Sequence, residues 1–480
     1  MAVADKRLTF SDCAFWVFAV SIALAPVGFG GNRPLPFGLV QTGLALSCIF
    51  LLFDRTAMAA PRFFARIGWA FALFGLVILW AWYQTMPFVP ASWINPLWSD
   101  AATTLGRPLR GAISISPEDS RVGLIRLITY VAAGALAYFH CQRSARAQRL
   151  VQALWAAGSV ICAYGLITYL LGINKILWFE KTAYEGDLTA VFVNRNHFAI
   201  YAGMIMLCGL ALSVQSWRSA VEKNGNVAPK MEFLQNWLAW KGLPQVVLLA
   251  LILVCIIFSH SRAGLMLTVA GFGAFIFFYL IYRKAWRLAA AALFFAFVGL
   301  TLIFVIAPYY SDRFAELFTD YSSRDRMSVY NLVLQAIRDN PWLGYGIDGF
   351  QPVFRLYQHG MVMEFLRAHS DFLESLLDLG IPVALMLWLA VALLLSGLVH
   401  GILNRRRHGS FAALALAASV MALGHALVDF DLQIPGVTLT WAVLLGAGLA
   451  QSWRASEKKG IVEPAAPKRN LAKSYKKYYE

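Results

Sequence analysis

Charged residues are scarce in this sequence of 480 residues: they make up 14% of it, whereas 59% of the residues are hydrophobic. Soluble chains average about 25% charged and about 45–50% apolar residues, so this composition excludes a soluble enzyme. Acidic residues are fewer than basic ones, 26 against 41, which gives a formal charge of +15. The basic residues cluster between apolar runs, which is typical of cytoplasmic membrane flanks and argues against nucleic acid as a partner.

The sequence also lacks the motifs of several common kinds of site. Its six cysteines lie in or beside apolar runs without CxxC spacing, which predicts neither a disulfide framework nor a cysteine metal site. No P-loop, zinc-binding spacing or nucleophile elbow occurs. Asp429-Phe-Asp431 resembles the Asp-x-Asp of metal-dependent sugar-nucleotide transferases, but it lies at the outer end of an apolar run, away from cytosolic nucleotides. We therefore expect no metal ion and no cofactor.

Long apolar runs dominate what is present, and most of them approach the 20 residues that a membrane helix needs. They fall at about 11–30, 37–53, 67–86, 122–140, 151–171, 197–215, 244–259, 263–282, 288–309, 381–400, 411–428 and 435–452. No small-residue cleavage site follows the first run, which is therefore expected to be a retained helix. The sequence predicts an all-α polytopic membrane protein with about 12 transmembrane helices, in which residues 1–452 form one bundle.

Basic clusters follow every second run and set the expected orientation. They are Arg55/Arg62/Arg66, Arg143/Arg146/Arg149, Arg283/Lys284/Arg287 and Arg405/Arg406/Arg407. We expect these loops and both termini to be cytoplasmic. Residues 453–480, which are rich in lysine and arginine, are expected to form a basic cytoplasmic tail against anionic lipid.

One of the opposite loops is much longer than the others and spans about 309–370. It contains six arginines and no lysine, a composition that favours bidentate binding of phosphate or carboxylate. Apolar residues recur at helical spacing from Met327 to Ile337, and Asn340-Pro341 then ends the pattern. We expect one amphipathic helix over 323–337 that lies on the bundle, followed by an irregular loop.

Three polar side chains lie at the outer ends of apolar runs, where the membrane makes charge costly. Arg195 lies between two asparagines just before the sixth run, and Arg262 occupies a tight turn between the seventh and eighth runs. His369 precedes Ser370, which is expected to cap a helix N-terminus. The positive end of the helix dipole favours the neutral imidazole, which can accept a proton.

Other side chains near these three are candidates for supporting roles. The candidates are His197, His260, Asp371 and Glu374. The two carboxylates follow His369 closely enough to orient its ring, and the two histidines neighbour the arginines. The competing structural interpretations are a snorkelling arginine at a helix end for Arg262, a loop arginine that orders its asparagines for Arg195, and a helix-start histidine for His369.

The ordered set of motifs resembles the O-antigen ligase and polymerase superfamily of bacterial envelope glycosyltransferases. The matching segments are Asn194-Arg-Asn-His-Phe-Ala199, Ser259-His-Ser-Arg-Ala-Gly264, Asn340-Pro-Trp-Leu-Gly-Tyr-Gly-Ile-Asp-Gly-Phe350 and His369-Ser-Asp-Phe-Leu-Glu374 up to Gly380-Ile381. The resemblance covers roughly residues 190 to 385. It implies a GT-C-like, metal-independent enzyme of the bacterial inner membrane. Such an enzyme takes a glycan from undecaprenyl pyrophosphate on the periplasmic face and transfers it to an acceptor sugar hydroxyl.

By the same resemblance, Arg195 and Arg262 bind the pyrophosphate and His369 is the essential histidine, acting as the base on the acceptor hydroxyl. The family's motif is less fixed around the first arginine, so Arg324 and Arg326 are alternatives to Arg195. This assignment is chemically consistent, because arginine forks stabilise the charge that develops on a leaving pyrophosphate and imidazole suits removal of the acceptor proton.

The sequence leaves three functions open: a polymerase, a ligase and a transporter. A polymerase adds repeat units, and a ligase moves a finished glycan to lipid A core; we favour the polymerase slightly because the outer loop is long and rich in arginine. The alternative of another class is a transporter of polysaccharide or lipid-linked glycan, which also has about twelve spans. Transporters place polar residues inside broken helices, whereas here the polar residues concentrate in the outer loops.

Overall fold

A computed structural model of the chain describes residues 9–53, 60–223, 242–310, 321–358, 365–405 and 409–453. The predicted tail beyond Trp453 lies outside these residues, as do Arg55, Arg406 and Arg407 of the predicted basic clusters.

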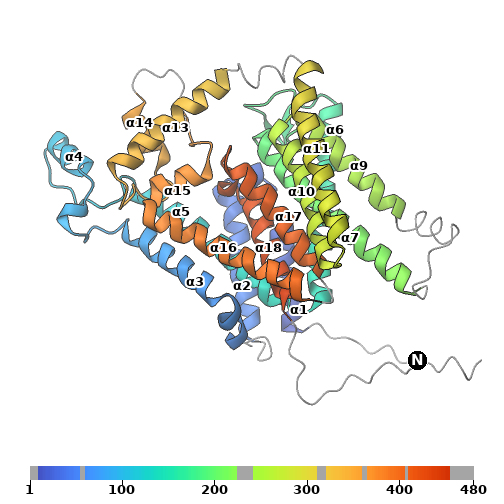
Figure 1. Cartoon of the computed structure of the whole chain (residues 1–480). Helices are drawn as coiled ribbons and strands as arrows, with labels where there is room; N and C mark the ends of the chain where they lie inside the picture. Colours follow the sequence, from blue (N-terminus) through green and yellow to red (C-terminus); the bar gives the residue numbers. More distant parts are fainter. Residues whose placement is uncertain are drawn as a thin grey trace, which may run out of the picture.

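The described structure is almost entirely helical, and each predicted apolar run coincides with one long helix (Figure 1). These helices are α1 (Phe10–Leu24), α2 (Pro34–Leu52), α3 (Ala60–Tyr83), α5 (Pro117–His140), α6 (Ser144–Leu170), α7 (Arg195–Lys223), α9 (Leu243–Phe258), α10 (Arg262–Tyr282), α11 (Trp286–Tyr310), α16 (Ile381–Asn404), α17 (Gly409–Ala426) and α18 (Pro435–Ser452). Among the described residues, eight helices are long and apolar enough to cross a membrane, and α1, α9 and part of α11 are apolar but shorter. The prediction of an all-α polytopic membrane protein is confirmed.

The most deeply buried long helices are α7, α17 and α18: 83% of the most apolar stretch of α7 and of α17 is buried, against 22% in α2 and α10, and every residue of α18 except Ala442 is buried. Small residues let these helices and their neighbours approach closely. A Cβ atom at Gly446 of α18 would collide with the carbonyl oxygen of Gly134 on α5. Such close backbone contacts are a common way to pack membrane helices, since lipid offers no hydrophobic driving force.

The predicted amphipathic helix is present as α13 (Tyr321–Asp339), and it ends just before Pro341 as expected. Gly344 and Gly346 follow it with positive φ angles of 69° and 98°, which glycine adopts without strain. The expectation of a wholly irregular loop after α13 is wrong, because α14 (Phe350–Tyr357) forms there. The next helix, α15 (Asp371–Leu379), begins directly after the predicted cap residue Ser370.

The other long loops also contain short elements that the sequence did not reveal. These are α4 (Leu97–Leu105) and an antiparallel pair of strands, β1 (Lys175–Ile176) and β2 (Phe179–Glu180). Each is too short to give a periodic pattern.

We call α13, α14 and α15 together the helical cap, because they share a small core of their own. Its buried members include Val333 from α13, Phe350 and Phe354 from α14, and Leu377 from α15. The cap is fastened to the bundle by Gln84 at the end of α3, whose Nε2 donates to the carbonyl oxygens of Leu343 and Asp378. These two hydrogen bonds anchor the segment after α13 and the C-terminal part of α15 to the bundle.

Candidate functional site

His369 lies in the connection that leads into α15, with a positive φ of 53°, which non-glycine residues adopt rarely. Two contacts hold this backbone. The Tyr330 hydroxyl on α13 donates to the carbonyl oxygen of His369 over 2.8 Å, and the Ser370 side chain accepts from the Leu373 amide as the predicted N-cap of α15. The imidazole packs edge to face on Phe430, with ring centroids 5.1 Å apart.

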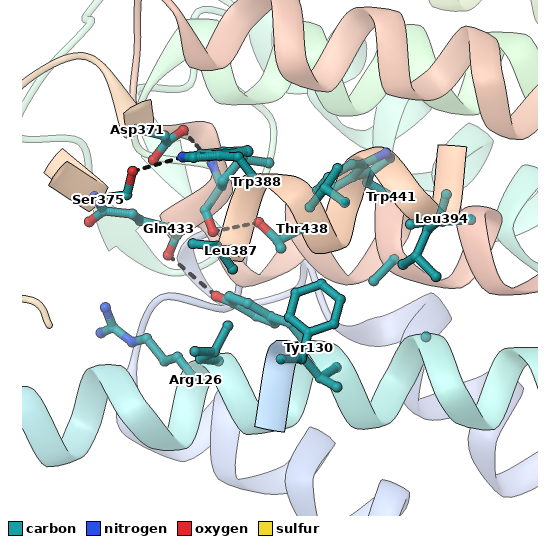
Figure 2. A pocket seen from close by; sticks show the side chains of 18 of the residues that line it. Arg126, Tyr130, Asp371, Ser375, Leu387, Trp388, Leu394, Gln433, Thr438 and Trp441 are labelled. Atoms are coloured by element: carbon teal, nitrogen blue, oxygen red, sulfur yellow. Dashed lines mark hydrogen bonds between the residues drawn. The ribbon is translucent and has the colours of Figure 1, made fainter. Parts of the chain in front are cut away.

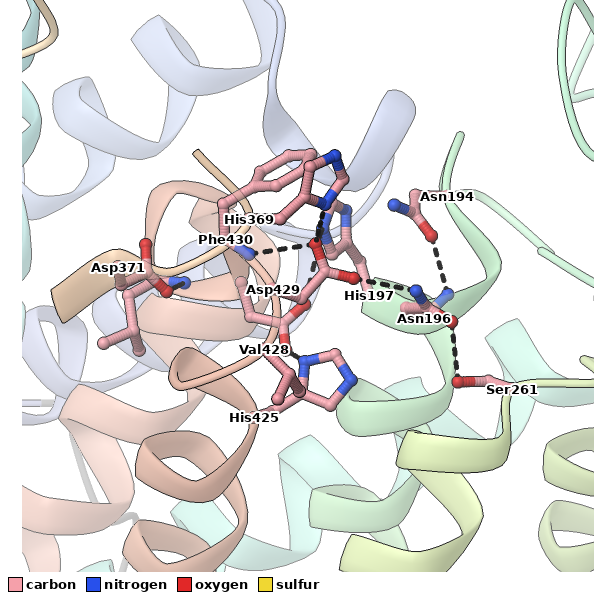
Figure 3. A network of polar contacts seen from close by, with 12 residues as sticks. Asn194, Asn196, His197, Ser261, His369, Asp371, His425, Val428, Asp429 and Phe430 are labelled. Carbon is pink, nitrogen blue, oxygen red and sulfur yellow. Dashed lines mark hydrogen bonds and ion pairs between the residues drawn. The ribbon is translucent and has the colours of Figure 1, made fainter. Parts of the chain in front are cut away.

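The carboxylate that holds the His369 ring belongs to Asp429, whose Oδ1 lies 3.1 Å from Nδ1 (Figure 3). Burial alone would raise the pKa of Asp429, but the hydrogen bond with His369 and charge interactions with His197 and His425 hold that pKa below its ordinary value. An ionised carboxylate only accepts hydrogen bonds, so the imidazole proton sits on Nδ1 in the neutral ring. Nε2 is then the nitrogen that can accept a proton.

The prediction that Asp371 or Glu374 orients His369 is wrong, because both carboxylates bind other groups. Asp371 Oδ2 accepts from the Leu432 amide over 3.0 Å. Glu374 accepts from the Arg367 guanidinium over 2.9 Å and from the backbone amide of Ala368 over 3.1 Å. They shape the backbone on either side of the histidine, and the ring itself is held by a residue sixty positions further along the chain.

Asp429 also links His369 to the two arginine motifs. Its Oδ2 accepts from Asn196 Nδ2 over 2.7 Å, and Asn196 Oδ1 accepts from Ser261 Oγ over 2.8 Å. Asn196 lies in the first turn of α7, and Ser261 is the N-cap of α10, whose first residue is Arg262. A continuous chain of hydrogen bonds therefore joins four segments that are far apart in the sequence (Figure 3).

Arg195 is the first residue of α7, and its Nη1 lies 2.8 Å from Asp187 Oδ2 in an ion pair. The other carboxylate oxygen of Asp187 lies 2.7 Å from Nδ1 of His260, in the turn between α9 and α10. The Arg195 guanidinium also stacks over the Tyr184 ring, 5.5 Å from its centroid. Asp187 thus fastens the segments that carry the two predicted arginines to each other.

The other arginines that the sequence singled out are Arg262, at the start of α10, and Arg324 and Arg326, on α13. Arg262 is half-buried at the start of α10, in a turn of three residues after α9, as the sequence indicated. Arg326 on α13 donates Nη1 to the carbonyl oxygen of Val428 over 3.5 Å, next to Asp429. The side chain of Arg324 lies outside the described part of the chain. Arg326 therefore reaches the same site from the helical cap.

Behind Asp429 lies a second group of buried side chains. His197 Nε2 is 3.4 Å from Asp431 Oδ1 and 3.9 Å from Asp429 Oδ1, and His425 forms an ion pair with the other oxygen of Asp431. These contacts hold the connection between α17 and α18, and with it Asp429, against the start of α7. Within the described ranges, no group of three or more His, Cys, Asp and Glu side chains could hold a metal ion.

Sequence reasoning missed the roles of Asp187 and Asp429, although it had a signal for each. Asp429 follows the eleventh apolar run, so the alternation of loops places it on the same face as His369. Asp187 lies eight positions before Arg195, in a loop that the alternation predicts to be on the outer face. Nearness in sequence pointed instead to Asp371 and Glu374 as partners of His369, but such nearness does not predict contacts between different helices.

Residues 247–388 match the family model described as O-antigen ligase. The matched segment runs from α9 into α16 and contains Arg262, Arg326 and His369. It ends before Asp429 and begins after Arg195. A search of curated proteins found no match.

Proposed function

We propose that the chain transfers a lipid-linked glycan during polysaccharide assembly, because residues 247–388 match the family model described as O-antigen ligase. The donor is a glycan on undecaprenyl pyrophosphate, and the acceptor is a sugar hydroxyl. Transfer takes place at the periplasmic face of the bacterial inner membrane. The reaction needs no metal ion.

The single observation that carries this proposal is the hydrogen-bond chain from His369 through Asp429 and Asn196 to Ser261. It brings a histidine with an available ring nitrogen next to the two helix starts that carry Arg195 and Arg262. A base and cationic groups for a leaving pyrophosphate are the two requirements of such a transfer.

In the proposed step, Nε2 of His369 takes the proton of the acceptor hydroxyl while the hydroxyl oxygen attacks the anomeric carbon of the donor. The bond between that carbon and the pyrophosphate oxygen breaks, and the electron pair leaves with the pyrophosphate. Asp429 holds the ring in the correct tautomer and stabilises the imidazolium that forms. Arg195 and Arg262, with Arg326 nearby, stabilise the departing negative charge.

The contacts of Arg195 fit a site that takes an anion. Asp187 occupies Nη1, and within the described residues the buried Nε has no hydrogen-bond partner. Asp187 orients the guanidinium before substrate arrives, which lowers the cost of ordering it. The side chain is 34% exposed, so a phosphate can reach it.

Polymerase and ligase activities share this chemistry and differ only in the acceptor. The match to the O-antigen ligase model favours transfer over transport, and no feature of the described residues favours the transporter specifically.

The test is transfer by the purified chain from an undecaprenyl-pyrophosphate-linked oligosaccharide to an acceptor glycan, in excess EDTA. His369→Gln keeps a hydrogen-bonding side chain but cannot take the proton, so the transfer rate should fall by about 10² to 10⁴ while donor binding is kept. The matched control is His140→Gln, since His140 is a buried histidine that contacts Ser47 at the far ends of α2 and α5. Near-normal transfer by His369→Gln, or activity that depends on added Mg²⁺ or Mn²⁺, contradicts the proposal.

A further inference from the structure

An open groove runs between α3, α5, α16 and α18, and its space amounts to about 1320 Å³ when the solvent at its mouth is included. Most of its lining is apolar and includes Phe71, Phe74, Leu394 and Leu445. On α18 the lining residues extend from Thr438 to Leu449, which is about 17 Å at a rise of about 1.5 Å per residue. That length corresponds to about half of the roughly 30 Å hydrocarbon core of a bilayer. An apolar groove of this depth between membrane helices fits the hydrocarbon chains of a lipid in one leaflet.

The two ends of the groove differ in polarity. Figure 2 shows Arg126, Asp371 and Ser375 at one end, and Leu394 and Trp441 towards the other. The groove is therefore amphiphilic in the same sense as a lipid, with a place for a head group at the polar end.

The polar end offers no net positive charge. Its acidic and basic lining residues are Arg126, Asp348, Asp371, Glu374 and Asp378. Arg126 pairs with Asp348 over 3.5 Å, and the neighbouring Arg367 pairs with Glu374 over 2.9 Å and with Asp348. Both arginines are thus already neutralised by carboxylates. A phosphate head group would find no free cation in this lining, whereas carboxyl groups readily bind hydroxyls.

Asp378 supplies a hydrogen-bonding position that the protein leaves open. The residue is only 6% exposed, and its Oδ2 accepts from the Asp348 amide over 2.8 Å. Within the described residues its Oδ1 has no hydrogen-bond partner. Buried polar atoms are nearly always paired, so this oxygen is suited to a hydroxyl from a bound molecule. Burial raises the pKa of Asp371 and Asp378, and in either protonation state the groove end stays without net positive charge.

The polar end lies beside the site that contains His369. Asp371 lines the groove and binds the Leu432 amide, and Leu432 belongs to the same connection as Asp429. Figure 3 shows Asp371 on one side of Asp429, and Asn196 and Ser261 on the other. A lipid in the groove and a pyrophosphate at the arginine segments would therefore approach His369 from opposite sides.

We propose that the groove between α3, α5, α16 and α18 binds the acceptor as a lipid whose head group is uncharged and rich in hydroxyls, seated at the carboxyl-lined end. The acceptor role rests on the proposed function, whereas the binding of such a lipid does not. The donor, with its charged pyrophosphate, binds elsewhere.

The binding test uses two photoactivatable probes with the same diazirine-bearing alkyl chain, one a maltoside and the other a phosphate. The full-length protein is placed in phosphatidylcholine nanodiscs, and labelled peptides are mapped by mass spectrometry. The maltoside should label groove residues of α5 and α18 at least tenfold more than the phosphate does. Excess dodecyl maltoside should compete with it, and dodecyl phosphate should not. Equal labelling by both probes overturns the proposal.

A matched pair of variants on α16 tests the position. Leu387 lines the groove, whereas Leu389 is 52% exposed and is not part of the lining. Leu387→Trp should lower maltoside labelling at least fivefold, and Leu389→Trp should not change it. In the transfer assay, Leu387→Trp should raise KM for the acceptor and leave donor binding unchanged. A raised KM for the donor alone would show that the donor lipid fills the groove and would overturn the assignment.

Different results would contradict the proposed glycan transfer and the proposed lipid binding in the groove. Labelling is measured without donor and should persist in His369→Gln, so loss of transfer with intact labelling leaves the groove assignment standing. Transfer that proceeds normally without selective maltoside labelling contradicts the groove assignment only.

Discussion

Arg262 begins α10 directly after its cap, Ser261, and the hydrogen bond from Ser261 to Asn196 ties it to the rest of the site. Guanidinium binds a pyrophosphate through two parallel N–H groups, and a lysine ammonium keeps the charge but loses this geometry. We expect Arg262→Lys to lower transfer almost as much as Arg262→Ala does, at normal protein abundance.

The control for this pair is Arg146→Lys, because Arg146 pairs with Asp12 at the start of α1, near the start of α6. Product formed from the lipid-linked donor is the quantity to compare. Near-normal transfer by Arg262→Lys would show that Arg262 is only a helix-end anchor.

The lowered pKa of Asp429 predicts how the stability of the folded protein depends on pH. The folded-state pKa of this carboxyl is lower than the unfolded value, which is about 3.9 for aspartate, so the ionised carboxylate stabilises the folded protein. That stabilisation is complete above the unfolded pKa and is lost as pH falls through the folded one. The difference in Tm between the natural chain and Asp429→Asn should therefore not shrink between pH 8 and pH 5. It should shrink only below about pH 4, as followed by intrinsic fluorescence. A difference that already disappears by pH 6 would contradict the buried, ionised state of Asp429.

The residues of the site were predictable in part. The placement of His369, Arg195 and Arg262 on one face follows from the alternation of basic loops, and the structure brings their segments together. The carboxylate that binds His369 was not predictable in this way. Within one helix, side-chain contacts follow fixed spacings. Asp429 contacts His369 only because the helical cap and the bundle pack against each other.

At the scale of single elements, α15 positions His369 through its N-cap. Replacing a capping serine by alanine typically costs about 1 kcal/mol, which corresponds to about a fivefold change in an equilibrium. Ser370→Ala should therefore lower kcat about fivefold and leave donor binding unchanged, because the histidine connection is ordered less of the time. Ser370→Thr keeps the capping hydroxyl and should restore most of the rate. A loss of rate in Ser370→Thr as large as in Ser370→Ala would show that capping is not the cause.

The long helices were predictable because membrane spans need long apolar runs, and their ends are marked by caps and prolines. The short helices α4 and α14 were not, since neither has a capping side chain at its N-cap residue, whereas the equally short α15 was indicated by its cap residue Ser370. Their formation depends on packing: Phe350 and Phe354 of α14 fill the core of the helical cap, which local sequence does not show.

At the scale of the whole molecule, the segments that carry Arg195, Arg262 and His369 meet at one end of the bundle (Figure 1, Figure 3). We expect this end to face the periplasm. After replacement of the six native cysteines, a cysteine at any of these three positions should react with an impermeant thiol reagent added to intact cells. Arg283→Cys, in the connection between α10 and α11, should react only after the membrane is broken. The reverse pattern would contradict the orientation.

We expect Asp429 to act on transfer through His369, and a double-mutant cycle tests this coupling most directly. Transfer rates are measured for the natural chain, His369→Gln, Asp429→Asn and the double variant, with donor binding as a check on folding. Groups that act as one unit are strongly non-additive. Asp429→Asn should therefore slow the natural chain by about 10² or more, and it should change the rate of His369→Gln less than about threefold. Full additivity of the two losses would contradict the account.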